Sequence, residues 1–547
     1  MKIEPILPPA RVKSMEASGL WPDRLITDYL DEAAGSRPDA VAIVDDNSVT
    51  RRATTLSYRQ LRRLSARMAL GLVRLGVNKG DVVSFQLPNW WQFSAMHLAC
   101  ARIGAVSNPL MHIFRQRELV FMLGFAESKV MVIPGSFRDF DYPKMMAEMR
   151  GQLPALEHVL AIEGHPEGSF EAALTTPRWE DRMDAAAVFA ERKSGPNEVT
   201  QIQYTSGTTG APKGVMHTPN TLFGALVPYI TRVGLTPADI VLMASPLAHQ
   251  TGFLYGVLMP IMLATKVVLQ DIWNPGVAAR HIAEEAVTFS MGSTPFLADL
   301  ADTPDLEKYD TSSLRIFLTA GAPIPRVLVH RATERLKITV FSAWGMTENG
   351  AVTCTRADDP PEKAFQTDGC ALEGLEVRVV DPENQPLPVG EEGRLQARGQ
   401  ANFVGYLKKP ELFDTDQEGW FETGDLARMD ADGYIRISGR SKDLIIRGGE
   451  NIPVVEVEDA LYRHPGVQDV AIVAMPDERL GERGCAFVVL RPEKTLSLGE
   501  MTAFLEGEKM ARQYHPERLE ILPEMPRTAS GKIQKFRLRE MAADLAG

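Results

Sequence analysis

The stretch YTSGTTGAPKGV, Tyr204–Val215, sets the class of this chain. It follows a strand-like run and combines glycines and hydroxyl side chains with a lysine. Glycines let backbone N–H groups turn toward an anion, hydroxyls donate further hydrogen bonds, and a lysine adds a point charge. The pattern therefore predicts a loop that holds a polyphosphate through Thr205, Ser206, Gly207, Thr208, Thr209, Gly210 and Lys213. It is not the P-loop pattern GxxxxGK[ST], because Pro212 precedes Lys213 and Gly214 follows it, which disfavours a P-loop kinase.

Around this loop, short apolar runs alternate with helix-like segments. Strand-like runs lie at 41–44, 82–87, 130–133 and 267–270, and amphipathic stretches lie at 58–75 and 89–103. This alternation is typical of βαβ units with parallel sheets. From Leu375 onward the runs 375–380, 393–399 and 433–439 alternate apolar and polar residues at period two. That pattern predicts a smaller antiparallel or barrel-like unit with one solvated face.

The last hundred or so residues predict a unit of their own. The segment RSKDLIIRGG, 440–449, mixes charges with a glycine pair and indicates a boundary. Beyond it we expect a helix near 454–464, strands at 467–475 and 486–490, and a helix at 498–512. These elements would form a compact α+β domain.

The amino-acid composition of the chain limits the kinds of partner that it is expected to bind. The chain of 547 residues has 59 Lys plus Arg and 71 Asp plus Glu, a net charge of −12, whereas binding to nucleic acid or anionic membrane needs a positive surface. Its four cysteines lack CxxC spacing, which disfavours a disulfide framework or a zinc site. The N-terminal segment lacks a signal-peptide apolar run, and Phe253–Thr265 is shorter than the roughly 20 residues of a membrane span. We expect a cytoplasmic protein, and a homodimer is compatible with the sequence.

Four further motifs accompany the loop, in the order TAGAP (Thr319–Pro323), AWGMTE (Ala343–Glu348), TGDLARMDADGYIRISGRSKDLIIRGGENI (Thr423–Ile452) and PRTASGKIQK (Pro526–Lys535). With them the chain resembles the adenylate-forming superfamily of acyl-CoA synthetases, firefly luciferase and peptide-synthetase adenylation domains. The resemblance implies an α/β fold with an α+β addition. An N-terminal body, 1–441, would hold two αβ-layered sheets and a β-barrel-like subdomain at about 370–441, and 442–547 would form a mobile C-terminal domain.

The resemblance also implies a reaction in two half-steps. A carboxylate attacks the α-phosphorus of ATP, giving an acyl-adenylate and pyrophosphate, and a thiol, usually that of coenzyme A, then displaces AMP. The first step brings an anion against a polyanion, so it requires preorganised positive charge and Mg²⁺. The implied partners are ATP, coenzyme A, Mg²⁺ and a small-molecule carboxylic acid.

Roles for single residues follow from the same resemblance. Glu348 would bind Mg²⁺, Thr347 would donate to the α-phosphate, and Asp425 would accept hydrogen bonds from the ribose hydroxyls. Arg440 would reach the ribose or the phosphate. The adenine slot would be lined by Gly321, Ala322 and Pro323, with Trp344 stacking on the base, and Gly345 and Met346 would also bind the nucleotide. Trp344 departs from the family, in which most members carry tyrosine; an indole keeps the stacking face and lacks the phenol hydroxyl.

The C-terminal motif supplies the lysine that this family uses in catalysis. Lys532 would bridge the carboxylate and the α-phosphate during adenylation only. It would then leave as the C-terminal domain rotates about a hinge at Lys442. The rotation would bring Gly448, Gly449 and Glu450 to the active site, where glycines can line a narrow tunnel for the pantetheine of coenzyme A.

The segment SPLAHQTGF, Ser245–Phe253, resembles the family segment that gates the acyl pocket, with His249 as the gate residue. It offers no carboxylate to pair an amino group, which disfavours an amino-acid substrate. The predicted pocket lining is His249, Thr251, Gly252, Gly292 and Ser293. This mostly apolar or small lining fits a short- or medium-chain fatty acid or an alicyclic acid such as cyclohexanecarboxylate, and the chain also looks like the ligases for those acids.

Three alternative functions are compatible with the same motifs. An acyl-adenylate ligase would deliver its product to the phosphopantetheine thiol of a carrier protein. A luciferase-like enzyme would use oxygen. A non-catalytic nucleotide-binding relative would be expected to lack Lys532 or Glu348, and both are present.

Overall fold

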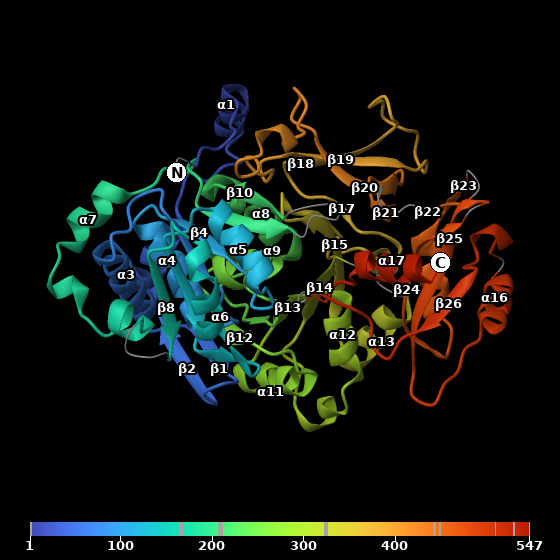
Figure 1. Ribbon diagram of the computed structural model, residues 1–547, viewed down its shortest axis with the longest axis horizontal. Helices are drawn as coiled ribbons and strands as arrows, with labels where there is room; N and C mark the ends of the chain where they lie inside the picture. Colours follow the sequence, from blue (N-terminus) through green and yellow to red (C-terminus); the bar gives the residue numbers. More distant parts are fainter. Residues whose placement is uncertain are drawn as a thin grey trace.

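A computed structural model gives the fold and describes residues 3–163, 168–205, 212–321, 326–440, 445–447, 450–477, 479–508, 510–528 and 531–545. Figure 1 shows a large N-terminal body, a sheet of residues 375–440 beside it, and the C-terminal elements gathered at one end of the long axis. The α/β fold class with an α+β addition is confirmed. Within the described ranges, no helix is both long and apolar enough to span a bilayer.

Two large sheets form the N-terminal body, together with a short hairpin of β6 (Ser136–Phe137) and β7 (Phe140–Asp141). The six-stranded sheet has the order β10 (Lys213–His217), β9 (Gln201–Thr205), β4 (Val106–Pro109), β3 (Val82–Phe85), β5 (Val130–Pro134) and β8 (His158–Ile162). The nine-stranded sheet has the order β17 (Cys370–Ala371), β16 (Gly350–Cys354), β15 (Thr339–Met346), β14 (Ile316–Ala320), β13 (Phe289–Gly292), β11 (Val241–Met243), β12 (Val267–Gln270), β1 (Val41–Asn47) and β2 (Arg52–Ser57). Strands β15 to β1 are parallel, as the alternation of strands and helices predicted.

Helices cover and separate these sheets. The N-terminal body contains α1 (Pro9–Ser18), α2 (Ile26–Ser36), α3 (Tyr58–Arg74), α4 (Trp91–Arg102), α5 (Gln116–Phe125), α6 (Tyr142–Met149), α7 (Ala185–Arg192), α8 (Pro219–Val233), α9 (Gln250–Gly252), α10 (Met259–Met262), α11 (Pro275–Glu285), α12 (Thr294–Asp302), α13 (Arg326–Leu336) and α14 (Lys363–Gln366). Helix α3 begins where Ser57 and Gln60 form a capping box. Helix α4 was predicted to be amphipathic, yet Gln92–Ala101 is buried throughout, because α4 packs within the largest apolar core.

The predicted antiparallel unit is a four-stranded sheet in the order β18 (Leu375–Val380), β19 (Gly393–Gly399), β20 (Phe421–Met429) and β21 (Ile435–Arg440). Along β20 buried residues alternate with half-buried ones, which places Thr423 and Asp425 on its buried face. The buried face of β20 therefore carries Asp425, the residue predicted to bind the ribose.

The C-terminal domain has a sheet of its own, in the order β23 (Glu450–Ile452), β22 (Ile445–Arg447), β25 (Gly481–Leu490) and β24 (Val467–Asp477), with β26 (Arg518–Ile521) beside β25. Helices α15 (Val454–Tyr462) and α16 (Leu498–Gly507) contribute to one small core and α17 (Lys535–Asp544) to another. This domain is α+β, as predicted.

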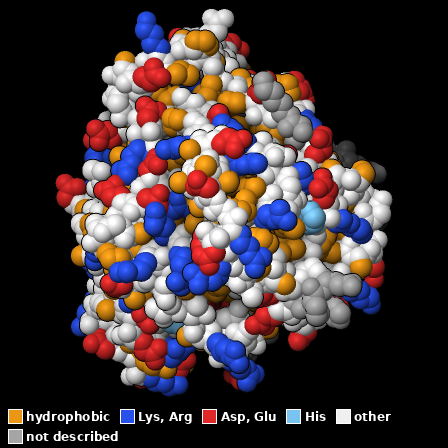
Figure 2. Space-filling view, turned by 90° about the vertical axis from the view of Figure 1, so that its left-hand side faces the viewer, with side chains coloured by type: hydrophobic (Ala, Val, Ile, Leu, Met, Phe, Trp, Pro, Cys, Tyr) orange, Lys and Arg blue, Asp and Glu red, His pale blue; other side chains and the backbone are white. Residues whose placement is uncertain are grey.

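The molecular surface carries charges of both signs. On the face that Figure 2 shows, basic and acidic side chains are interspersed, without a broad field of one sign. On this face, therefore, the charges do not form a patch of a single sign.

Candidate functional site

The predicted phosphate loop leaves and re-enters the six-stranded sheet at its edge. Strands β9 and β10 are antiparallel and pair Thr205 with Lys213, so the two ends of the loop lie side by side. The residues Ser206, Gly207, Thr208, Thr209 and Gly210 lie outside the described residues. The lysine at the end of this hairpin has its Nζ 4.8 Å from the ring centroid of Tyr406, a cation–π distance.

Tyr406 connects that lysine to the predicted magnesium ligand. Its hydroxyl donates to Oε1 of Glu348 at 2.8 Å, and only 5% of Glu348 is exposed. Burial and the adjacent Glu348 carboxylate raise the pKa of Tyr406, so the phenol keeps its proton and remains a donor. Sequence reasoning missed Tyr406, which sits in NFVGYLKKP without a recognisable spacing to either partner.

A buried histidine holds the backbone of Thr347. His217 Nε2 lies 2.8 Å from the carbonyl oxygen of Thr347, and its Nδ1 lies 3.0 Å from Oγ1 of Thr221. A carbonyl only accepts, so Nε2 carries the proton. Burial lowers the pKa of His217 to about 4, which keeps the ring neutral and this tautomer populated at neutral pH. His217, like Tyr406, was not singled out from the sequence.

The motif AWGMTE forms the end of β15 and the turn into β16. The two strands are antiparallel, with a register shift between Trp344 and Gly345. A β-carbon at Gly345 would lie 1.9 Å from the carbonyl oxygen of Gly350, so only glycine fits there. The side chain of Asn349 accepts from the backbone N–H of Met346 at 3.2 Å, which closes the turn that presents Thr347 and Glu348.

Trp344 directly contacts Asp425, the residue predicted to bind the ribose. Its indole Nε1–H donates to Oδ2 of Asp425 at 2.9 Å, and the two side chains are 7% and 3% exposed. A charge-assisted hydrogen bond between buried groups restricts the orientation of the carboxylate. The sequence alone did not indicate this contact between Trp344 and Asp425. Arg440 lies opposite Asp425 in the β20–β21 pairing.

The predicted acyl segment runs from β11 into the helical segment 250–258. Gln203 on β9 donates through Nε2 to the carbonyl oxygen of Ala248 at 2.7 Å and so attaches this segment to the phosphate-loop strand. His249 precedes α9, and its Nδ1 accepts from the backbone N–H of Thr251 at 3.3 Å. A β-carbon at Gly252 would lie 2.1 Å from the carbonyl oxygen of Pro246, which requires glycine.

Lys532 reaches this site from the C-terminal domain. A β-carbon at Gly321, which follows β14 with φ +87°, would lie 2.7 Å from Cε and 3.2 Å from Nζ of Lys532. Burial and the charge of Lys532 together lower the pKa of His249 to about 3, so this imidazole is neutral. The catalytic lysine predicted from the sequence thus lies between Gly321, at the end of β14, and His249 of the predicted acyl segment.

The loop that carries Lys532 also contacts the predicted acyl pocket. A β-carbon at Gly531 would lie 2.6 Å from Oγ of Ser293, which is 6% exposed and has no hydrogen-bond partner among the described residues. Ser293 follows Gly292 at the end of β13 and precedes α12. The backbone of Thr528 pairs with Gly531 and Lys532 at 2.9 and 2.7 Å, which fixes the base of the loop.

Glu450, one of the three residues assigned to coenzyme A, is not at this site. Glu450 pairs with Arg447 in the β22–β23 hairpin, and β23 lies at the outer side of the C-terminal domain, away from β14 and β15 (Figure 1). Gly448 and Gly449, the predicted hinge Lys442, and Ala322 and Pro323 of the predicted adenine slot lie outside the described residues.

The residues at the phosphate end fit a magnesium ion that is shared with a nucleotide. Mg²⁺ in such sites takes one or two carboxylates and completes its shell with phosphate oxygens and water. Glu348 supplies one buried carboxylate, and the described residues contain no cluster of three or more His, Cys, Asp or Glu that would form an all-protein cage. When bound, the ion would neutralise charge on the phosphates.

Known proteins share both the sequence and the fold. Residues 30–407 match the AMP-binding enzyme family, and residues 456–532 match the AMP-binding enzyme C-terminal domain. The medium-chain fatty-acid–CoA ligase of Escherichia coli K12 is 37% identical over 99% of this chain and 94% of its own length. The 2,3-dihydroxybenzoate-AMP ligase of Bacillus subtilis is 32% identical over 99% of this chain and 98% of its own length.

Solved structures of MatB from Rhodopseudomonas palustris resemble the chain in two forms. The ATP-bound form is 26% identical, with a TM-score of 0.82 over 95% of this chain and 100% of its own. The apo form is 27% identical with the same coverages, and its TM-score is 0.69. As a whole, the chain is thus more similar in structure to the ATP-bound form than to the apo form. The chain belongs to the AMP-binding family of adenylate-forming enzymes, as an AMP-forming acid–thiol ligase.

Proposed function

We propose that this enzyme activates a short- or medium-chain fatty acid or an alicyclic acid with ATP and transfers the acyl group to coenzyme A. The observation that carries the proposal is the position of Lys532, which lies beside Gly321 and close enough to His249 for its charge to lower the pKa of that histidine. A cation there lies between the nucleotide strands and the acyl segment, where the attacking carboxylate and the α-phosphate must meet. Preorganised charge at that point stabilises the transition state of adenylation.

The remaining residues would each bind a different part of the nucleotide. Lys213 and Glu348 lie at the phosphate end and are joined through Tyr406. Asp425, which Trp344 orients, accepts hydrogen bonds from the ribose hydroxyls. Arg440, opposite Asp425 on the neighbouring strand, is proposed to bind the ribose or the phosphate. Thr347, held through its carbonyl by His217, donates to the α-phosphate.

The neutral state of His249 supports an apolar acyl group. An uncharged imidazole next to Gly252 adds no charge to the pocket wall, and the E. coli relative is named for medium-chain fatty acids. Each methylene that such a wall buries contributes about 0.8 kcal/mol, or roughly a fourfold gain in kcat/KM. We therefore expect kcat/KM to rise with chain length until the pocket is full.

An aromatic acid is the second candidate, because the B. subtilis relative is named for 2,3-dihydroxybenzoate. The deciding experiment is a panel of acids scored by pyrophosphate release: fatty acids from butyrate to dodecanoate, cyclohexanecarboxylate, benzoate and 2,3-dihydroxybenzoate. A preference for the fatty or alicyclic acids supports the first proposal, and a preference for the aromatic acids replaces it with the second.

The thioester step requires a second arrangement of the domains. With Lys532 at the site, the β22–β23 hairpin that carries Glu450 is directed away from it. We propose that the C-terminal domain rotates about Lys442 after adenylation and brings Gly448, Gly449 and Glu450 to the pantetheine thiol. AMP release measured with coenzyme A and, separately, with a phosphopantetheinyl carrier protein distinguishes the acceptors. Turnover with the carrier protein alone contradicts the assignment of coenzyme A.

A further inference from the structure

A cavity of about 460 Å³ lies away from the nucleotide site, at the other edge of each of the two large sheets. Strands β1 and β2, the start of α4, the segment before α6 and the end of β8 form its walls. Strand β1 is five strands away from β15, about 24 Å at roughly 4.8 Å per strand. The cavity is therefore separate from the site that contains Lys532.

Two buried acceptors at this cavity lack a donor. Asp45 is 1% exposed; its Oδ2 accepts from the backbone N–H of Trp91 at 2.9 Å, and its Oδ1 has no partner among the described residues. Gln92 is 9% exposed, and its Oε1 likewise lacks a partner within the described ranges. An unsatisfied buried oxygen costs about 1–3 kcal/mol. Both residues line the cavity, and a ligand N–H group that reached either oxygen would relieve this cost.

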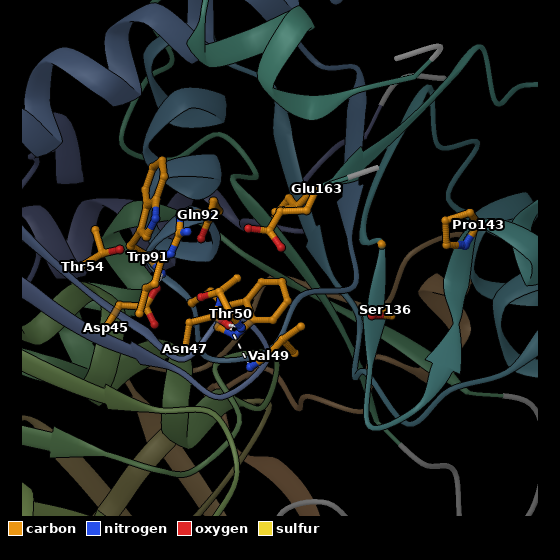
Figure 3. A pocket seen from close by; sticks show the side chains of 14 residues that line it. Asp45, Asn47, Val49, Thr50, Thr54, Trp91, Gln92, Ser136, Pro143 and Glu163 are labelled. Carbon is orange, nitrogen blue, oxygen red and sulfur yellow. Dashed lines mark hydrogen bonds between the residues drawn. The ribbon is translucent and has the colours of Figure 1, made fainter. Parts of the chain in front are cut away.

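The walls combine negative charge with indole rings. The charged lining residues are Asp45, Glu163 and Arg52, two acids against one base. Figure 3 shows Asp45, Trp91 and Gln92 on one side of the cavity and Glu163 facing them. Trp90 and Trp91 also line it, and indole faces attract organic cations. Burial raises the pKa of Asp45 to about 7; the nearby Asp271 and Asp46 raise it further, and the hydrogen bond from Trp91 opposes the shift.

We propose that this cavity binds a small organic cation, an amine or a guanidinium on a flat apolar body, with Asp45 and Gln92 as its hydrogen-bond acceptors. The cation would lie between the Asp45 and Glu163 carboxylates, and its body would pack on the indole of Trp91. The volume of about 460 Å³ limits the ligand to the size of a metabolite and leaves no room for a folded peptide.

Calorimetric titration of the full chain with tryptamine, and with its neutral counterpart tryptophol, tests the proposal. We expect tryptamine to bind the wild type and to lose affinity by about tenfold or more in Asp45→Asn and in Gln92→Met. Asparagine keeps an oxygen for the N–H of Trp91, so Asp45→Asn removes the charge with little change in shape. Glu411→Gln, an exposed change outside the cavity, is the matched control and should bind as the wild type does.

Several results would overturn the proposal: no heat of binding for tryptamine or for agmatine, a guanidinium probe; equal affinity for tryptophol; or unchanged affinity in both cavity variants. Pyrophosphate release by Asp45→Asn without the amine should equal that of the wild type, since the cavity is remote from Lys532. A loss of that activity would place Asp45 in the adenylation machinery and contradict the separation of the two sites.

Discussion

Replacing Trp344 by phenylalanine tests the contact between its indole and Asp425. The change keeps an aromatic face at the predicted adenine slot and removes the Nε1–H that donates to Oδ2 of Asp425 at 2.9 Å. Both side chains are buried, so water does not readily replace the lost donor. A hydrogen bond to a charged group is worth about 1.5–3 kcal/mol. If that energy orients the carboxylate toward the ribose, KM for ATP rises by about 10- to 150-fold.

The assay is the initial rate of pyrophosphate release over a range of ATP concentrations at a saturating concentration of the carboxylic acid. Trp179→Phe is the matched control, because it removes an indole hydrogen bond of the same 2.9 Å length, to the carbonyl oxygen of Ala173, in the N-terminal body. We expect the control to leave KM for ATP unchanged. An unchanged or lowered KM in Trp344→Phe refutes the reasoning, since it would mean that Asp425 binds the ribose equally well without the indole.

Three further predictions concern other residues. Lys532→Ala should lower the rate of adenylation by about two to four orders of magnitude and leave thioester formation from supplied acyl-adenylate nearly intact; equal loss in both half-reactions contradicts its role. His217→Phe removes the donor to the Thr347 carbonyl and should lower kcat/KM for ATP about tenfold, with the far-UV circular dichroism spectrum as the check of folding. For Asp45, whose folded pKa of about 7 lies above its unfolded value of 3.8, the native state holds the extra proton, so stability falls as pH rises between those values. The difference in the free energy of unfolding between Asp45→Asn and the wild type, measured by chemical denaturation, should therefore grow in favour of the variant from pH 4 to pH 7 and then level off. The total change should approach about 4 kcal/mol, and a difference that does not vary with pH argues against the shift.

Much of the fold could be predicted from local patterns. The run 41–44 forms β1, 58–75 forms α3 to within a residue, and the period-two segment at 375–380 is β18. Periodicity reports which faces of an element are apolar, and that was enough for the class of each layer. It failed for α4, because a helix buried on all sides has no polar face to reveal its environment.

The sequence by itself determined the motif order, and with it the family, the reaction class and the lysine expected to act in adenylation. Tertiary structure alone decided which side chains meet: Tyr406 with Glu348, 58 residues apart, Trp344 with Asp425, 81 residues apart, and Lys532 with Gly321. It also decided that Asp45 and Gln92 share a cavity at the far edge of the sheets. The physical reason is that a spacing along the chain fixes neighbours only within one helix or strand. Contacts between elements depend on strand order and domain docking, which arise from the burial of the whole core.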